Sequence, residues 1–138
     1  MDDGNIGYLL HRISFGLNYR SNSILKKQLN IGFSQFKILL VLLGRNKCSQ
    51  KDIASALTQS EASISRQVKK MTKLGLLEPE LNLSDRRTKH TGLTKKGKRL
   101  CERGLIYLND YYQPMFNHLS YKERSDLYKS LIELKNLL

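Results

Sequence analysis

The chain contains few of the residues that cross-link, interrupt or anchor a protein. Of its 138 residues only two are cysteine and two are proline. Two cysteines do not supply the disulfide framework of a small secreted domain, and so few prolines leave long helices uninterrupted. The longest aliphatic run, residues 38–43, is far shorter than the ~20 apolar residues that cross a bilayer, so we expect no membrane span.

Features of export and of catalysis are also missing. The N-terminus reads MDDGN, with acids where a signal peptide carries basic residues, so we expect a cytoplasmic protein. The three histidines, at positions 11, 90 and 118, lack metal-ligand spacing, and the sequence has no glycine-rich phosphate loop or nucleophile elbow. We therefore expect no metal, no cofactor and no enzymatic activity. The length of the chain is that of a single domain.

Acidic residues are scarce relative to basic ones, and most of the imbalance lies in the middle of the chain. The sequence holds 24 Lys and Arg against 12 Asp and Glu, a net charge of +12. Residues 46–100 carry thirteen of these basic and five of these acidic side chains, which is two thirds of the excess. This distribution favours a polyanionic partner, most commonly nucleic acid. Charge alone leaves two alternative interpretations open: a surface that is charged for solubility, and a patch that binds anionic lipid.

Apolar residues recur at helical spacing through most of the chain. The pattern predicts a helix over residues 5–28 and a second helix over 33–43, which is apolar nearly all round and ends at Gly44. Further along, Thr94 is expected to cap a long helix. Pro114 is expected to kink or interrupt that helix, because proline lacks the backbone N–H of a helical hydrogen bond.

Two short helices separated by a tight turn are predicted between these segments. Ser49 caps the first, which ends at Leu57. Ser60 caps the second, and Gly75 closes it as a left-handed C-cap. This arrangement is typical of a helix-turn-helix. Residues 76–78 and 89–93 then predict two strands joined by a turn, which together would form a wing behind the helix pair.

The second helix of this pair has an apolar face and a polar face. Ile64, Val68 and Met71 recur at helical spacing and are expected to be buried. The polar face carries hydrogen-bond donors and two cations without an acid: Ser63, Arg66, Gln67 and Lys70. Such a face can enter a DNA major groove and reach base edges, although the solvated face of an ordinary helix has the same composition.

Four motifs occur in a fixed order along the chain. They are SQKDIASAL at 49–57, SISRQVKKMTKLGLLE at 63–78, SDRRTKHTGLTKKGKRL at 84–100 and LSYKERSDLYKSL at 119–131. With these motifs, the chain resembles the multiple-antibiotic-resistance regulator (MarR) family of bacterial winged-helix transcription factors from about residue 9 to 138. The resemblance implies a mainly α fold with a small β wing, formed as one domain over 1–138. Residues 32–99 would form the winged helix-turn-helix lobe, and 5–30 and 100–138 intertwined dimerisation helices.

The resemblance further implies a homodimeric repressor that binds an inverted-repeat operator in double-stranded DNA, in the cytoplasm at the nucleoid. Arg87 would enter the minor groove, whose negative potential attracts arginine, while Asp85 holds its guanidinium. Arg86 and Lys89 would contact phosphates. A winged helix that binds protein or RNA without operator specificity is the alternative function. The expected DNA-binding residues are Gln50, Lys51, Ser60, Ser63, Ser65, Arg66, Gln67, Lys70, Asp85, Arg86, Arg87 and Lys89.

The apolar stripes near the two ends of the chain predict an interface independently of the resemblance. They have little to pack on within a small winged-helix core, and exposed stripes of this size mark contact surfaces. The C-terminal stripe lies on a helix whose start is marked by a capping box of Ser120 and Glu123. The expected dimerisation residues are Ile6, Leu9, Leu10, Ile13, Leu17, Met115, Leu119, Leu127, Leu131, Leu134 and Leu138.

A small-molecule ligand is a further expectation from the resemblance. Many relatives lose DNA affinity when a small aromatic ligand enters a crevice between the dimer helices and the DNA-binding lobe. The alternative, which the sequence favours for each residue that would line such a crevice, is an ordinary core or interface aromatic. The sequence leaves the redox role of Cys48 and Cys101 open. Nearby lysines and Arg99 could lower the pKa of the Cys101 thiol, whereas a free buried cysteine behaves as a small hydrophobe. The candidate ligand-binding residues are Tyr8, His11, Phe15, Tyr107 and Tyr111.

Overall fold

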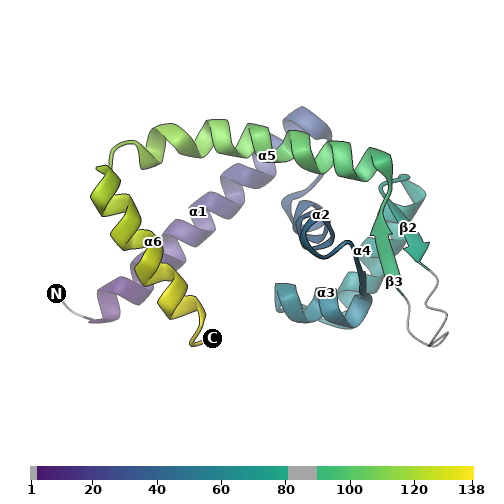
Figure 1. Ribbon diagram of the computed structural model, residues 1–138, viewed down its shortest axis with the longest axis horizontal. Helices are drawn as coiled ribbons and strands as arrows, with labels where there is room; N and C mark the ends of the chain where they lie inside the picture. Colours follow the sequence, from purple (N-terminus) through teal and green to yellow (C-terminus); the bar gives the residue numbers. More distant parts are fainter. Residues whose placement is uncertain (1–2, 81–89) are drawn as a thin grey trace. The chain divides into compact units, whose positions relative to one another are not determined.

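The structure is mainly α-helical with one small antiparallel sheet. The computed structural model describes residues 3–80 and 90–138. The chain divides into two compact units, Met1–Leu105 and Ile106–Leu138, with the boundary inside a long helix. In chain order (Figure 1) the elements are α1 (Asp3–Leu29), α2 (Phe33–Arg45), β1 (Lys47–Ser49), α3 (Gln50–Leu57), α4 (Glu61–Lys73), β2 (Leu77–Glu80), β3 (His90–Leu93), α5 (Lys95–Phe116) and α6 (Tyr121–Lys135).

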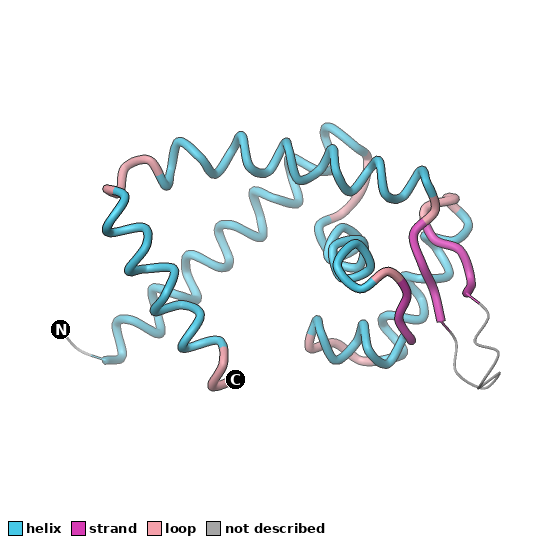
Figure 2. Tube along the Cα trace, in the orientation of Figure 1, coloured by secondary structure: helices cyan, strands magenta, loops and turns pink. Residues whose placement is uncertain are grey.

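The sheet has the strand order β1-β3-β2, with β3 antiparallel to both neighbours (Figure 2). Strands β2 and β3 form the two sides of the predicted wing, and Leu77 pairs with Leu93 at the end nearest α4 and α5. Strand β1 was not predicted from the sequence. This strand has only three residues, too few for the alternating pattern that identifies a strand, and it exists because β3 offers it a free edge.

Serine caps position both helices of the helix-turn-helix, as the sequence predicted. The Ser49 Oγ accepts a hydrogen bond from the Asp52 N–H at 3.0 Å, and the Asp52 carboxylate accepts one from the Ser49 N–H at 3.4 Å. Hydrogen bonding with Ser49 favours the ionised carboxylate and lowers the pKa of Asp52. The Ser60 Oγ accepts from the Ser63 N–H at 3.1 Å. Between the helices Thr58 has φ 54°, which turns the chain tightly.

The core of the first unit lies between α2 and the two short helices. α2 buries Phe36, Leu39 and Leu42, while α3 contributes Ile53 and α4 contributes its predicted stripe. Burying side chains of this size stabilises a fold by about 1.5–3 kcal/mol each. The core therefore holds α4 by one face and leaves its other face outward.

One prediction about a helix end was wrong. α2 does not end at Gly44 but continues to Arg45, and the residue with positive φ is Asn46. Asparagine adopts such conformations more readily than most residues, so the glycine is not needed there. α5 continues through Pro114 to Phe116, so the proline does not interrupt the helix. Pro114 lies in the last turn, where its missing N–H costs a single helical hydrogen bond.

The start of α5 is bonded to the end of α4. Gly75 has the predicted positive φ, 75°, and its carbonyl accepts a hydrogen bond from the Thr94 hydroxyl at 2.6 Å. The Thr94 N–H donates to the Leu76 carbonyl at 3.1 Å. The same hydroxyl accepts from the Gly97 N–H, so Thr94 caps α5 as predicted. Lys96 donates through Nζ to the Leu74 carbonyl at 2.9 Å. Together these bonds fix the exit of α4 against α5.

The second unit is a helical hairpin made of the end of α5 and all of α6. Ser120 and Glu123 form the predicted capping box, with a 2.7 Å bond from the Ser120 N–H to the carboxylate. Tyr112 contacts Phe116 edge to face, with ring centroids 6.4 Å apart. At the turn, Arg124 donates to Asn117 Oδ1 at 3.0 Å. These contacts define the corner between the two helices.

Candidate nucleic-acid interface

Helix α4 presents a cationic surface away from the core. Its predicted apolar stripe is buried, with exposed fractions of 0% for Ile64, 6% for Val68 and 0% for Met71. Arg66 and Lys70 are exposed on the other side, as predicted. Lys69 and Lys73 are exposed there too, although the sequence analysis omitted them. The sequence did indicate that both lysines share the face of Arg66, because they follow it at the i+3 and i+7 positions of the helix.

The exposed face of α4 carries four cations: Arg66, Lys69, Lys70 and Lys73. None of them has an ion-pair partner among residues 3–80 and 90–138. The nearest acid along α4 is Glu61, in its first turn, where a carboxylate is favoured by the helix dipole. Unpaired cations on one helix face produce a strongly positive local potential. The surface formed by these four side chains is therefore suited to an anionic partner.

The smaller polar residues of the predicted site differ in their surroundings. Ser63 and Ser65 are half-buried on α4, whereas Ser60 is exposed and its hydroxyl serves as the helix cap. Gln67 is half-buried, and its Oε1 accepts a hydrogen bond from the Gln35 Nε2 of α2 at 3.4 Å. Sequence reasoning missed the role of Gln35 because its partner is 32 residues away and no local pattern connects them.

The first turn of α3 lies beside the start of α4. Gln50 is half-buried there, and Lys51 is exposed at the rim of a shallow depression. Thr58 and Glu61 line the same depression from the turn and from α4. The structure thus brings Lys51 and the N-terminal end of α4 to one surface.

The predicted wing-tip residues lie outside the described residues; they are Asp85, Arg86, Arg87 and Lys89. The strands that lead to them are described as far as the pair Glu80 and His90. Lys96, which precedes Gly97 in the first turn of α5, donates a hydrogen bond to the Leu74 carbonyl at the C-terminal end of α4. A lysine at a helix C-terminus also interacts favourably with the helix dipole.

The candidate ligand-binding aromatics belong to different units. Tyr8, His11 and Phe15 are exposed on α1, and Phe15 is 76% exposed. Tyr107 and Tyr111 lie on the second half of α5, where Tyr111 contacts the neighbouring Tyr112 ring at 5.5 Å. A shared ligand crevice therefore stays a prediction from the sequence.

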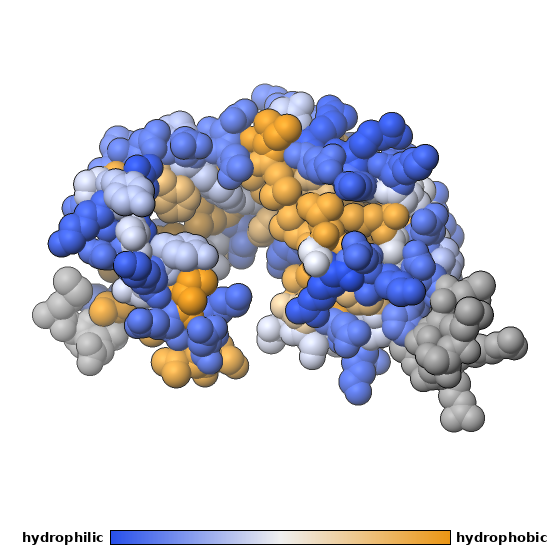
Figure 3. Space-filling model, in the orientation of Figure 1, coloured by the Kyte–Doolittle hydropathy of each residue, from blue (hydrophilic) through white to orange (hydrophobic). Residues whose placement is uncertain are grey.

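The predicted dimerisation residues are largely exposed on the single chain. On α1, Ile6 is 46%, Leu9 54% and Ile13 55% exposed. In the second unit Leu127, Leu131 and Leu134 are exposed along α6, and hydrophobic side chains gather at the surface over its C-terminal part (Figure 3). Leu17 and Leu119 are only half-buried. Both helices thus carry apolar surface that the chain itself does not cover.

The two cysteines are buried, and the pKa of each thiol is raised. Burial raises the pKa of the Cys101 thiol to about 11, and the adjacent Glu102 contributes in the same direction. The nearby cations do not overcome this effect, because they are exposed to solvent whereas the sulfur is fully buried. Burial also raises the pKa of Cys48, against a smaller opposite effect of Arg45. Neither thiol has the thiolate character of a redox sensor.

We therefore expect both thiols to resist alkylation in the folded protein. At pH 8, which is below the raised pKa of either group, the thiols remain protonated and their sulfur atoms are shielded. Mass spectrometry after iodoacetamide treatment should show almost no adduct in buffer and two adducts in denaturant. Rapid labelling of Cys101 without unfolding would contradict the burial described here.

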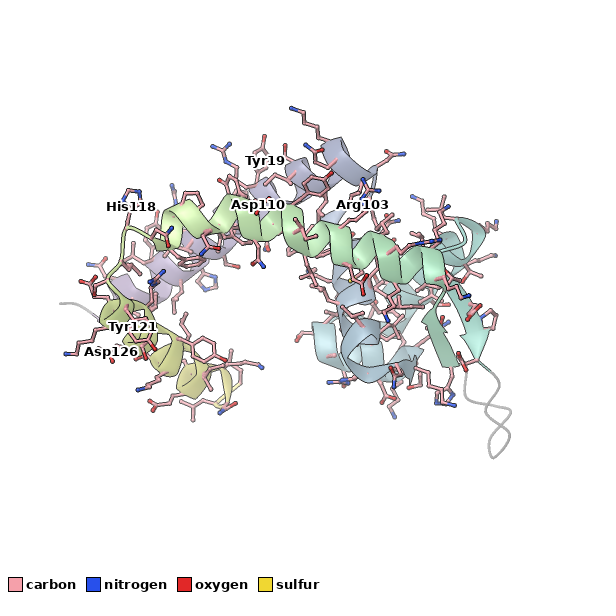
Figure 4. All side chains as sticks on the ribbon, turned by 45° about the horizontal axis from the view of Figure 1, so that its top comes forward. Tyr19, Arg103, Asp110, His118, Tyr121 and Asp126 are labelled. Carbon is pink, nitrogen blue, oxygen red and sulfur yellow. The ribbon has the colours of Figure 1, made fainter. Side chains whose placement is uncertain are left out.

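Metal-ligating groups do not converge in the described part of the chain. Within residues 3–80 and 90–138, no group of three or more His, Cys, Asp or Glu side chains could hold a metal ion. His118 lies in the turn after α5, away from Asp126 on α6 (Figure 4). Of the helices in these residues, none combines the length and the apolar character needed to traverse a bilayer.

A helix-turn-helix followed by a two-stranded wing on a three-stranded sheet defines a winged helix-turn-helix protein. Residues 29–88 match the sequence profile of the MarR family. The chain is therefore similar to the MarR family across its helix-turn-helix, and the members of that family are transcriptional regulators and not enzymes. The resemblance seen in the sequence motifs is thereby confirmed.

Similar proteins extend over nearly the whole chain. An uncharacterised HTH-type transcriptional regulator of Bacillus cereus is 27% identical over 139 residues, covering 97% of this chain and 92% of the relative. A cysteine-to-serine mutant of MarR from E. coli, in complex with operator DNA, has a TM-score of 0.82 at 22% identity, covering 94% of this chain and 93% of that one. BldR from Sulfolobus solfataricus has a TM-score of 0.89 at 19% identity, covering 100% of both chains. The two structures share the fold.

Proposed function

We propose that this regulator binds double-stranded DNA with sequence specificity and represses transcription from the bound site. The observation that carries the proposal is the outward face of α4, with four cations unpaired among the described residues, opposite a fully buried apolar stripe. A helix held in this way can enter a major groove while its cations contact phosphates. MarR from E. coli, with the same fold, is known in complex with operator DNA, which supports a DNA partner for this chain.

We infer that the DNA-binding form is a homodimer. The exposed apolar residues of α1 and α6 form stripes that a second copy of the chain could cover. Two-fold symmetry would present two copies of α4, so the operator should be an imperfect inverted repeat. Its half-sites should lie about one helical turn apart, ~34–36 Å. The small aromatic ligand suggested by the sequence would then act by lowering the operator affinity of this dimer.

Selection from a random duplex pool tests the proposal. The enriched fragments should contain one inverted repeat, and affinity should fall on the order of a thousandfold between 50 and 200 mM salt, as expected for several phosphate contacts. Unrelated duplexes should bind more weakly at every salt concentration. Enrichment of no common sequence, or equal binding of single-stranded RNA, would favour the interaction-module alternative instead.

Replacing Arg66 by alanine should weaken binding to the selected operator and relax base preference. The expected loss is about 1–3 kcal/mol, the usual effect of removing a base contact. Arg86→Ala is the comparison, because a phosphate contact at the wing would weaken all duplexes alike. Fluorescence anisotropy on cognate and scrambled duplexes measures both effects. Unchanged selectivity in the Arg66 variant would show that α4 reads DNA through another face.

Replacing Leu127 and Leu131 by glutamate should separate the dimer into monomers at micromolar concentration. Both leucines are exposed on α6, and burying two carboxylates in an apolar interface is unfavourable. Lys129→Glu serves as the control, because residue 129 lies on the opposite side of the helix. Analytical ultracentrifugation should show a dimer for the wild type and the control. A wild type that sediments as a monomer would contradict the dimer proposal.

A further inference from the structure

Gln35 is a buried amide of the DNA-binding lobe with a specific pair of partners. It lies in the first turn of α2 and is only 9% exposed. Its Oε1 accepts a hydrogen bond from the Gly32 N–H at 3.4 Å, which caps the helix. A backbone N–H can only donate, so this contact determines which end of the Gln35 amide is the oxygen.

This assignment determines the next amide as well. With its oxygen toward Gly32, Gln35 directs its Nε2 to α4, where the Gln67 Oε1 lies 3.4 Å away. An amide nitrogen can only donate, so Gln67 has to offer its oxygen. We call this chain of groups, from the Gly32 N–H through Gln35 to Gln67, the amide relay. The backbone of α2 thus sets the orientation of a side chain on the helix proposed to bind DNA.

The relay leaves the amino group of Gln67 available. Among residues 3–80 and 90–138, the Gln67 Nε2 has no hydrogen-bond acceptor, and the side chain is partly exposed beside Arg66. The oxygen and nitrogen of an amide diverge from the same carbon. An oxygen that points toward α2 therefore favours a nitrogen that points away from it.

On the basis of the proposed DNA-binding function, we propose that Gln67 reads one base pair in each half-site as a donor only. Gln35 is the positioning residue for this contact. An unrestrained glutamine recognises adenine with both ends of its amide, donating to N7 and accepting from N6. With its oxygen directed toward Gln35 on α2, Gln67 instead presents its amino group and selects a base that offers acceptors alone. These are guanine, through O6 and N7, and thymine, through O4.

Replacing the hydrogen-bond donor that residue 67 presents to DNA by an acceptor tests the proposal. In Gln67→Glu the side chain still accepts from the Gln35 Nε2, but its second oxygen can only accept from DNA. The preferred base at that position should therefore change from guanine or thymine to cytosine or adenine, whose exocyclic amino groups donate. Selected duplexes should show at least about a fivefold reversal of preference at one symmetric pair of positions. Total affinity will fall with the added negative charge, so relative preference is the readout.

Two methionine variants separate reading from positioning. Gln67→Met removes the amide and should make that position indifferent to the base. Gln35→Met leaves Gln67 in place without its restraint. Discrimination against adenine should then fall about fivefold, while the other positions of the selected site stay unchanged. A merely structural role for Gln35 would reduce affinity for all duplexes and leave the base preference intact. Thermal melting establishes that each variant is folded.

The outcomes distinguish this proposal from the one on which it rests. If the wild type selects no sequence at all, the DNA-reading function itself is overturned. If the wild type selects an inverted repeat and both Gln67 variants select the same repeat, the reading role of Gln67 is overturned. If Gln67→Glu reverses the preference but Gln35→Met leaves it unchanged, the relay is overturned. Should Gln35→Met fail to fold, the reversal by Gln67→Glu still decides the base contact.

Discussion

Replacing Gly97 by alanine should destabilise the protein by about 3 kcal/mol, the upper end of the usual effect of overpacking. A Cβ on residue 97 would lie 2.0 Å from the carbonyl oxygen of Leu76, well inside any allowed contact. That oxygen accepts the hydrogen bond from the Thr94 N–H, so it cannot move without breaking the junction between α4 and α5. Relief of the clash therefore requires the two helices to separate. The variant should lose DNA affinity together with stability.

Thermal unfolding followed by circular dichroism measures this effect, with Gly44→Ala as the matched control. Gly44 lies inside α2 and has no atom within 4 Å of an added Cβ. Alanine there should stabilise the protein by about 0.5–1 kcal/mol, because glycine loses more backbone entropy in a helix. The same chemical change should thus act in opposite directions at the two positions. Equal melting temperatures for the Gly97 variant and the wild type would contradict the close helix contact.

Replacing Gly104 by alanine should cost about 2–3 kcal/mol for a different reason. The added Cβ would lie 2.3 Å from Cε2 of Phe36, whose ring is completely buried at the centre of the first unit. A surface ring could rotate away, but close-packed neighbours prevent this one from doing so. The strain should therefore spread to α2. This glycine lets α5 approach the core of the DNA-binding lobe.

A double-mutant cycle identifies the source of that strain. Phe36→Leu alone should destabilise the protein, because it removes buried ring surface. Combined with Gly104→Ala, it should cost less than the sum of the two changes, since the smaller side chain leaves room for the methyl group. Urea denaturation of the four proteins gives the coupling energy. Strict additivity would show that Gly104 and Phe36 do not meet in the folded protein.

Most local features of the DNA-binding lobe could be predicted from neighbouring residues. Ser49 with Asp52, and Ser60 before α4, act over three residues, so their caps are visible in the sequence. The buried stripe of α4 follows from helical periodicity in the same way. The end of α2 shows the limit of such signals. The helix continued past Gly44 because glycine permits a helix to end without requiring it.

Features that depend on distant residues escaped prediction. Strand β1 is too short to show a pattern, and it forms because β3 pairs with it from 43 positions further along the chain at Cys48 and Thr91. The raised pKa of Cys101 could not be predicted from the sequence either. The sequence shows the cations near it, but not that the sulfur is buried while they remain in solvent. In both cases the deciding neighbour comes from another element.

The sequence by itself determined the class of this protein, because charge distribution, capping residues and helical periodicity are short-range properties that survive without a fold. Only the tertiary structure decided which groups are available to a partner. It showed that Lys96 is bonded to the end of α4 and that the Gln67 oxygen is bonded to α2, while four cations on α4 remain unpaired within the described residues. The physical reason is that hydrogen bonds and burial depend on distance in space, and the chain brings these groups together only when it folds.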